Sequence, residues 1–436
     1  MNKRISNRRS FLKTITAGAA GALAAPYVIT SNALGNASIL PASERITLAH
    51  IGVGGQGSGL LKHFLGLNDC QSVAICDPFR NRREGRAQMV NDRYAQKYNQ
   101  PSYKACQACN DFRSIMARDD VDAVVIATPD HWHVPIALAA ARAGKDMYVE
   151  KPLGLSVEQN IILRREIKQY GVIFQYGTQQ RAQSHLHHGC ELVRNGRLGK
   201  IHSIEVVAPG GVPGGSTREL PIPEGFDYDL WQGPAPVAPY TNDRCIGLGR
   251  WFCYDYAIGF LGGWGAHPLD ILDWVFNHIE PNPVEFEGTG VIPTEGLFDT
   301  VTTWKVHCKY ANGVKMTFVD GLDSTKFIGD QGWIRMGRGH LSAGNPSILK
   351  DTIGPNEVRL HKSNDHKQDL LNCIKTRSRP ASHIDTAVRS DTISHLSDIA
   401  IRTGRKIKWD PIKEEIVGDE AASRMLSRPM RTPWRL

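Results

Sequence analysis

Outside its first 37 residues, this 436-residue chain lacks any marked excess of positive or negative charge. Those residues contain five basic side chains and no acidic one, which leaves 47 basic and 44 acidic residues in the other 399. A net charge of +3 on so large a segment gives no electrostatic basis for binding nucleic acid, so we exclude that partner. No later apolar run is long enough to cross a membrane, so the mature protein is expected to have no span.

The chain also lacks the pattern of a metal site. Of its nine cysteines, only Cys106 and Cys109 form a C-x-x-C pair, and no second pair stands at zinc spacing. His131 and His133 form a His-x-His pair with no third histidine or carboxylate at suitable spacing. We therefore predict no metal ion, and we interpret the two cysteines as a structural pair of thiols or a local disulfide.

Residues 1–37 have the pattern of a targeting segment. A twin arginine at 8–9 precedes a small-apolar run at 15–29, and small-x-small sequences within 31–37 fit a cleavage site. The pair resembles a bacterial twin-arginine signal, although Asn7 stands where Ser or Thr is usual. We expect a periplasmic or otherwise exported protein. An uncleaved anchor, a basic tail and a cytoplasmic protein with a misread signal are the alternatives.

Residues 45–177 alternate between short apolar runs and helix-like stretches. Runs of this kind are typical of parallel strands buried on both faces. The alternation predicts an α/β fold whose N-terminal Rossmann domain contains a doubly wound parallel sheet. The expected strands are Ile46–Val53, Val73–Cys76, Ala123–Ala127, Met147–Val149 and Val172–Gln175.

A different pattern begins at residue 178. Residues 208–249 are rich in Pro and Gly, and a loop of this length is usually functional. Alternating apolar residues on both sides of Asn312-Gly313 predict an antiparallel hairpin with one apolar face. We expect a C-terminal α/β substrate and oligomerisation domain at 178–385, with an open, mainly antiparallel sheet, and a closing helix and tail at 386–436.

A glycine-rich turn follows the first expected strand. Gly52, Gly54 and Gly57 form Gly-x-Gly-x-x-Gly, with Gln56 inside the motif, directly between a strand and a helix. This is the arrangement in which backbone and helix N-terminus bind a pyrophosphate. Asp77 ends the second strand, where its carboxylate would accept from a ribose 2′-hydroxyl, and this favours NAD. Three arginines within the next six residues could hold a 2′-phosphate, so NADP stays open.

Polar side chains follow three further strands, at the carboxyl edge where ligands bind in open α/β sheets. A lysine at this edge could protonate or deprotonate a substrate hydroxyl, provided that burial or a neighbouring cation lowers its pKa. A surface lysine is the alternative. Contacts to cofactor or substrate are expected from Thr128, Pro129, His131, His133, Glu150, Lys151, Gln179 and Arg181.

Together these blocks resemble the Gfo/Idh/MocA family, which contains glucose–fructose oxidoreductase and inositol dehydrogenase. The resemblance rests on residues 52–57, 128–133, 150–152 and 263–270 and covers roughly residues 45–436. It implies a Rossmann domain followed by an α/β domain whose sheet covers the nicotinamide, with the substrate between the two.

The resemblance also implies roles for individual residues. The family lysine corresponds to Lys151, and the second catalytic position, a His or Tyr on a helix, corresponds to His267. Many members have an aspartate four residues before that position, where this chain has Gly263. Asp270, one helical turn beyond His267, could orient its ring and contact the substrate. A helix-capping or core role is the alternative for His267.

Tyr254 and Asp255 belong to a mixture of aromatic and polar residues that is common both in carbohydrate sites and in aromatic cores. We name them as candidate substrate contacts. A homo-oligomer is a further expectation, formed through an exposed sheet face that carries Trp304 and Val306.

The implied function is an NAD(P)-dependent oxidoreductase that acts on a sugar, a polyol or a glycoside. Since free NAD is scarce outside the cell, export implies a tightly held cofactor that is restored within each cycle. Two alternatives remain open. One is an NAD-dependent glycosidase or lyase that works through a transient 3-keto sugar, and the other is a non-catalytic sugar-binding protein on the same scaffold.

Overall fold

The computed structural model describes residues 40–436, and residues 46–436 form one compact unit. The predicted signal at 1–37 lies outside the described residues. No helix in the described part of the chain is both long and apolar enough to cross a bilayer.

The N-terminal half of the compact unit contains a six-stranded sheet in which all neighbours run parallel, in the order β3-β2-β1-β4-β5-β6. The predicted doubly wound sheet is confirmed. Its strands are β1 (Ile46–Ile51), β2 (Cys70–Cys76), β3 (Gln107–Cys109), β4 (Ala123–Ile126), β5 (Asp146–Val149) and β6 (Phe174–Tyr176). Strand β3 was not predicted, because its three residues are largely exposed and form no apolar run.

Helices cover both faces of this sheet, which explains its continuous apolar strands. They are α3 (Gly55–Phe64), α4 (Arg80–Lys97), α5 (Arg113–Met116), α6 (Asp130–Arg142) and α7 (Val157–Tyr170). A late helix, α13 (His366–Thr376), packs through Leu370 and Leu371 onto the layer that contains β1 and α3. Helix α6 begins at Asp130, so the histidine pair lies in its first turn.

The second half contains a nine-stranded sheet in the order β13-β12-β11-β7-β10-β9-β8-β14-β15. Only β7 and β10 run parallel, so the expected mainly antiparallel sheet is confirmed. Its strands are β7 (Ile201–Ala208), β8 (Glu285–Val291), β9 (Thr303–Lys309), β10 (Lys315–Asp320), β11 (Ser324–Gly329), β12 (Gly332–Gly337), β13 (His340–Ala343), β14 (Ile407–Asp410) and β15 (Glu415–Ile416).

One face of this sheet is apolar and covered by helices, while the other is polar. Strand β9 alternates fully between exposed and buried residues, and its buried residues include Trp304 and Val306. The expected exposed face with these two residues is therefore wrong, since they pack against the helices of the domain core. The covering helices are α8 (Ser184–Arg194), α12 (Ala266–Phe276) and α14 (Ile384–Thr403).

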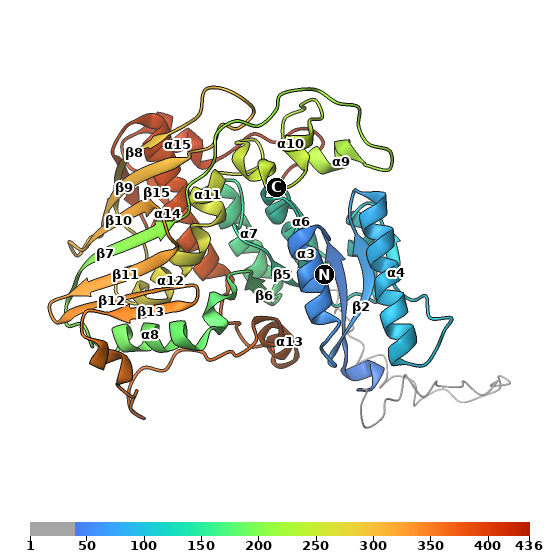
Figure 1. Cartoon of the computed structure of the whole chain (residues 1–436), viewed down its shortest axis with the longest axis horizontal. Coiled ribbons are helices and arrows are strands. Elements are labelled where there is room, and N and C mark those ends of the chain that lie inside the picture. The colour runs from blue at the N-terminus through green and yellow to red at the C-terminus, as the bar shows by residue number, and fades with distance from the viewer. Residues whose placement is uncertain (1–39) are drawn as a thin grey trace, which may run out of the picture. The chain divides into compact units, whose positions relative to one another are not determined.

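Residues 209–258, here called the cover segment, run from the second sheet to the Rossmann domain, where α9 and α10 are labelled in Figure 1. The segment adds no strand to either sheet. Its short helices, together with those that follow it and those near the C-terminus, are α9 (Tyr228–Gln232), α10 (Asn242–Cys245), η3 (Gly249–Phe252), α11 (Gly259–Gly263), α15 (Glu420–Ser423) and η5 (Arg424–Leu426). Three remaining short turns are η1 (Ala42–Glu44), η2 (Gln179–Ala182) and η4 (Pro346–Lys350).

The cover segment is anchored on the Rossmann domain by rings and backbone bonds. The rings of Phe226 and Phe79 stack with centroids 3.7 Å apart. The amide of Arg80 donates to the Gly225 carbonyl at 2.8 Å, and the amide of Asp227 donates to the Pro78 carbonyl at 3.1 Å. The segment therefore lies over the carboxyl edge of the six-stranded sheet.

Candidate active site

The glycine turn after β1 has the close packing that its sequence predicts. Gly52 has φ +82°, a left-handed conformation, and a Cβ there would lie 2.7 Å from the Ala127 carbonyl oxygen. A Cβ on Gly57 would lie 1.9 Å from the carbonyl oxygen of Gly52. Gly54 differs, because the nearest atom to its Cβ position is 3.9 Å away, on the Arg82 guanidinium. The turn is thus tight at two glycines and open toward the cavity at the third.

Asp77 holds the end of β2 against this turn. Its Oδ2 accepts from the amide of Val53 at 2.9 Å, and its Oδ1 accepts from the amide of Phe79 at the same distance. Burial raises the pKa of this carboxyl, while the two amides and the nearby arginines oppose the shift. Each oxygen keeps an unused lone pair, so the carboxylate can still accept from a ligand hydroxyl.

A cavity, here called the glycine cavity, extends from this turn along the sheet edge. One wall comes from the Rossmann domain and includes Gly54, Gln56 and Asp77. The opposite wall comes from the cover segment: Leu230, Trp231, Cys245, Gly247, Leu248, Arg250 and Trp251. A ligand in this cavity would be enclosed between the two.

A second cavity, here called the lysine cavity, adjoins the first, since Gln56, Thr128, Arg250 and Trp251 line both. Among the remaining lining residues, the Rossmann domain contributes Asp130, His133, Glu150 and Lys151, and the C-terminal domain contributes Gln179, Trp264, His267 and Arg338. The structure therefore brings the predicted lysine and histidine together from elements far apart in the chain.

The ammonium group of Lys151 is held by a main-chain oxygen. Its Nζ donates to the carbonyl of Gly263 at 2.6 Å. The resemblance implies an aspartate at the position of Gly263, and in this chain the main-chain carbonyl of that residue accepts from the lysine. A carbonyl orients the amine without adding a negative charge.

Burial lowers the pKa of Lys151, and the cations Arg338 and Arg250 lower it further. The carboxylates of Glu150 and Asp130 oppose this shift. Glu150 is itself constrained, since its Oε1 accepts from the Gln56 amide at 2.6 Å and its Oε2 from the Lys151 backbone amide at 3.3 Å. The lysine is thus prepared to exchange a proton closer to neutral pH than an exposed lysine is.

Asp130 is a site residue that the sequence analysis missed. It lines the lysine cavity, and its Oδ1 accepts from the Trp251 indole at 3.1 Å, while its buried Oδ2 has no partner among the described residues. Burial raises its pKa to about 7, against the pull of Lys151 and Arg250. The signal available in the sequence was its position, directly after a strand and at a helix start.

His267 lies on the opposite wall, in the first turn of α12. Its Nε2 is 3.2 Å from a guanidinium nitrogen of Arg338, which makes Nε2 the acceptor and places the ring proton on Nδ1. Burial, with Lys151 and Arg338 nearby, holds the pKa of His267 well below its usual range. The imidazole is therefore neutral, and Arg338 was a second residue that the sequence analysis missed.

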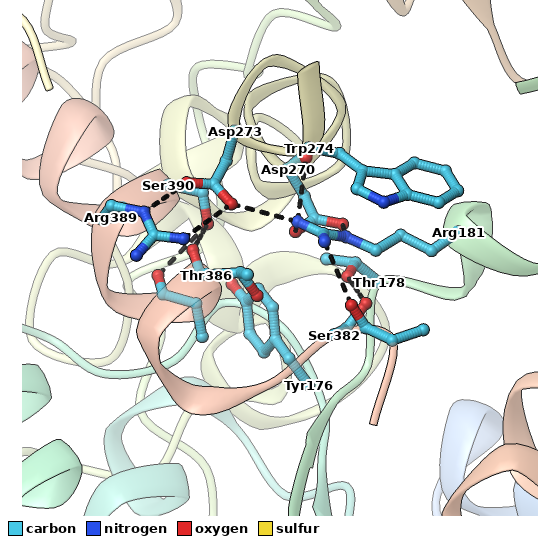
Figure 2. Close-up of polar contacts among 12 residues, drawn as sticks. Tyr176, Thr178, Arg181, Asp270, Asp273, Trp274, Ser382, Thr386, Arg389 and Ser390 are labelled. Carbon is cyan, nitrogen blue, oxygen red and sulfur yellow. Dashed lines mark hydrogen bonds and ion pairs between the residues drawn. The ribbon is translucent and has the colours of Figure 1, made fainter. Parts of the chain in front are cut away.

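Two expected substrate contacts lie outside this cavity. Arg181 and Asp270 form a buried ion pair in which Arg181 Nη2 is 2.6 Å from Asp270 Oδ1, and Asp273 accepts from the same nitrogen at 3.2 Å (Figure 2). Arg389 also contacts Asp273, at 2.5 Å. The idea that Asp270 orients the His267 ring is wrong, because its carboxylate is used by Arg181.

Two more candidates face a different cavity. Tyr254 and Asp255 line a cavity whose other walls include residues near the C-terminus, such as Arg428. The Tyr254 ring lies between the guanidinium groups of Arg402, at 3.4 Å, and Arg428, at 3.7 Å. The structure therefore places Tyr254 and Asp255 outside the lysine cavity, away from the expected substrate site.

The histidine pair divides between two environments. His131 points away from the lysine cavity, its Nε2 lies 2.9 Å from the Trp231 carbonyl, and burial lowers its pKa to about 3. His133 lines the lysine cavity between the carbonyls of Pro152, 2.6 Å from Nδ1, and Thr128, 2.9 Å from Nε2. Of the predicted neighbours, Pro129 lines the glycine cavity and Gln179 the lysine cavity.

Neither the cysteines nor the acidic residues form a metal centre in the part of the chain that the structure describes. All nine cysteines are free thiols. Cys109 does not pair with Cys106, and its side chain instead contacts Cys76 on the neighbouring strand.

Two family models match the chain. Residues 46–178 match the oxidoreductase family's NAD-binding Rossmann fold, and residues 214–436 match the family's C-terminal α/β domain, both named for Gfo/Idh/MocA proteins. Among curated relatives, an alpha-N-acetylgalactosaminidase of Shewanella oneidensis is 34% identical over 169 residues. This match spans 35% of the chain and only 35% of that relative.

Solved structures share the fold at low identity. The WlbA dehydrogenase of Bordetella pertussis, solved with NADH and UDP-GlcNAcA, is 15% identical with a TM-score of 0.60, covering 84% of this chain and 99% of that one. The aldose-aldose oxidoreductase of Caulobacter crescentus, solved with glycerol, is 18% identical with a TM-score of 0.58, covering 84% and 99%.

Proposed function

Because the chain belongs to the Gfo/Idh/MocA oxidoreductase family, we propose that it is an NAD(P)-dependent enzyme acting on a sugar, a polyol or a glycoside. Lys151 is the principal acid or base, and His267 assists it. The observation that supports this proposal most is the buried Lys151 amine in the lysine cavity, which shares lining residues with the adjoining glycine cavity.

The residues of the glycine cavity fit a dinucleotide. The open Gly54 position and the start of α3 suit a pyrophosphate, and Asp77 suits a ribose hydroxyl. The hydroxyl of half-buried Thr128 has no partner among the described residues and would gain one from the ligand. When bound, the cofactor supplies a hydride acceptor or donor at the nicotinamide. NAD is favoured, and NADP remains an alternative that Arg82 would serve.

Lys151 removes a proton from a substrate hydroxyl during oxidation of the carbon and returns it during reduction. The Gly263 carbonyl fixes the direction of the amine, and Glu150 and Asp130 hold the charged form once the proton is taken up. His267 stays neutral and faces the same space, so it contributes a hydrogen bond rather than a charge.

The first experiment is analysis by mass spectrometry of small molecules released from denatured protein that was matured through its own export route. Stoichiometric NAD or NADP would support a retained, internally recycled cofactor. If the protein contains no nucleotide and also fails to bind added nucleotide, the proposal that it is an NAD(P)-dependent enzyme is contradicted. A non-catalytic sugar-binding protein would then be favoured.

The role of Lys151 is tested by Lys151→Ala and Lys151→Arg, with turnover followed on a substrate that the wild type converts. We expect both variants to retain nucleotide and to lose at least 10²-fold in kcat, the usual contribution of a positioned acid or base. Full activity of Lys151→Ala would contradict the mechanism.

A redox-neutral glycosidase is the second candidate, favoured by the similarity to the Shewanella oneidensis alpha-N-acetylgalactosaminidase. In this candidate the sugar is transiently a 3-keto compound, and Lys151 removes the neighbouring acidified C–H proton before the glycosidic bond breaks. Turnover in deuterated water distinguishes the two candidates. Deuterium at C2 of the product is expected for the glycosidase and none for simple oxidation.

Export is part of the proposal. We expect a precursor with an Arg8→Lys/Arg9→Lys replacement to remain in the cytoplasm of a host that exports the unmodified chain to its periplasm. Equal periplasmic yield of both would contradict the twin-arginine route.

A further inference from the structure

Cations and indole rings alternate along one side of the lysine cavity. Arg250 lies over the ring of Trp251 at 4.7 Å, and Lys151 lies 5.4 Å from that ring and 5.8 Å from the ring of Trp264. Arg338 completes the row, 5.3 Å over Trp264. Three positive groups thus line a single small cavity.

Few negative groups balance this row. The only carboxylates that line the cavity are Glu150, which already accepts from Gln56 and from a backbone amide, and Asp130. Within residues 40–436, neither Arg250 nor Arg338 forms an ion pair with a carboxylate. The hydrogen-bond partner of Arg250 is the Gly247 carbonyl, and that of Arg338 is the His267 ring. Asp130 acts on Arg250, and Asp323 acts on Arg338, only without direct contact, so each guanidinium keeps N–H groups that no carboxylate binds.

The two arginines differ in what they can reach. Arg250 lines both cavities and sits on the side of the glycine turn, where a dinucleotide carries its phosphates. Arg338 lines the lysine cavity alone. An anionic ligand group on Arg338 would therefore belong to the molecule bound beside Lys151.

We infer that the substrate is an acidic sugar whose carboxylate or sulfate group binds Arg338, with its ring against Trp264. The inference rests on the proposed function, which makes the lysine cavity the substrate site. A planar guanidinium binds either anion through two parallel N–H bonds. One nitrogen of Arg338 donates to His267, which leaves its other N–H groups for the ligand and fixes its direction.

The test measures binding to the purified, nucleotide-containing protein by calorimetry, so that it does not depend on turnover. The probes are three matched pairs. Two are methyl glycosides, namely glucuronide with glucoside and galacturonide with galactoside, and the third is glucose 6-sulfate with glucose. The variants are Arg338→Ala and Arg338→Lys. Arg335→Ala is the matched control, since Arg335 lies on β12, three residues before Arg338, contacts Glu205 at 3.2 Å and is outside the cavity.

We expect at least one acidic probe to bind at least tenfold more tightly than its neutral partner. Arg338→Ala should abolish that preference, Arg338→Lys should retain part of it, and Arg335→Ala should leave it unchanged. Preference for uronides identifies a carboxylate, and preference for the sulfate ester identifies a sulfate. Equal binding of both members of every pair, binding of none, or a preference that survives Arg338→Ala would overturn the inference.

The same samples separate this inference from the proposed function, because absorbance at 340 nm reports reduction of the bound nicotinamide. If neutral sugars reduce the bound nicotinamide and no acidic probe binds more tightly than its neutral partner, the inference alone is contradicted. The opposite result is binding of an acidic sugar that depends on Arg338, with no change in the redox state of the nicotinamide and no conversion of any added sugar. That result contradicts the proposed function alone.

Discussion

At the residue scale, the proton chemistry of the lysine cavity depends on groups that differ in how burial affects them. Burial disfavours the charged forms of Lys151, Asp130 and His267, so it lowers the first and third pKa values and raises the second. The lysine and the aspartate stabilise each other's charged forms, whereas His267 is opposed by its cationic neighbours. The contribution of each side chain to the pKa of the others can therefore be tested by replacing one residue at a time.

Replacing Asp130 by Asn should lower the pKa of Lys151 further, because the carboxylate favours the charged amine. A base must be neutral to accept a proton, so we expect the rising limb of the kcat profile to move to lower pH by about half a unit to one unit. Since burial raises the pKa of Asp130 to about 7, wild type and variant should converge below that pH. A limb that stays in place or moves upward would argue against the coupling.

The buried Arg181 is a structural residue on this geometry. Arg181→Met leaves the fully buried Asp270 carboxylate without its partner, and we expect a loss of about 3–5 kcal/mol in the free energy of unfolding. The double variant Arg181→Met/Asp270→Leu should recover most of that loss. Urea denaturation measures both. An unchanged stability with a raised KM in the single variant would instead restore the substrate-binding hypothesis.

At the element scale, the turn between β1 and α3 offers a matched pair of glycines. Gly57→Ala places a Cβ 1.9 Å from the Gly52 carbonyl oxygen, so the turn must open and nucleotide content should fall below a tenth of the wild-type value. Gly59→Ala meets nothing within 4 Å on the exposed face of α3 and should stabilise the protein by about 0.5–1 kcal/mol. Mass spectrometry and thermal unfolding read out the two effects, and equal nucleotide content in both variants would contradict the assignment.

The elements that the sequence predicted are those with local signals. The apolar runs of β1, β4 and β5, the glycine turn and the lysine after β5 all follow from residues adjacent in the chain. Arg338 could not be predicted, because it lies in a β-turn and meets His267 across 71 residues. Arg181 was misplaced for a related reason. Its position at the sheet edge was correct, but the direction of its side chain is set by Asp270, 89 residues away.

At the scale of the whole molecule, the cover segment closes the glycine cavity by contacts with two distant regions. Its Phe226 ring stacks on Phe79 of the Rossmann domain. Its Pro234 carbonyl accepts from the amide of Arg431, in the C-terminal region, at 2.9 Å. Trp434 also packs on Trp132, with ring centroids 4.7 Å apart. We therefore expect these contacts to slow the release of a cofactor that lies beneath the segment.

Phe226→Ala should therefore speed nucleotide release by at least tenfold, because the stacked ring is lost from the anchor. Val237→Ala in the same segment is the control, since the Val237 side chain is 73% exposed and should leave the rate unchanged. Release is measured as nucleotide remaining bound after dilution. Identical retention in Phe226→Ala would show that the segment does not limit escape.

The lysine cavity has walls from three stretches of chain that do not share a strand: the Rossmann domain, the cover segment and the C-terminal domain. In evolutionary terms, the residues that carry the reaction can therefore be conserved while the segments that select the substrate change. A lineage can lengthen, shorten or replace the cover segment and the β12–β13 turn while the glycine turn and Lys151 stay under unchanged selection. Descendants of one ancestral enzyme can then acquire new sugars by exchanging loops, and chimeras that graft this segment onto a relative should transfer substrate preference without transferring cofactor preference.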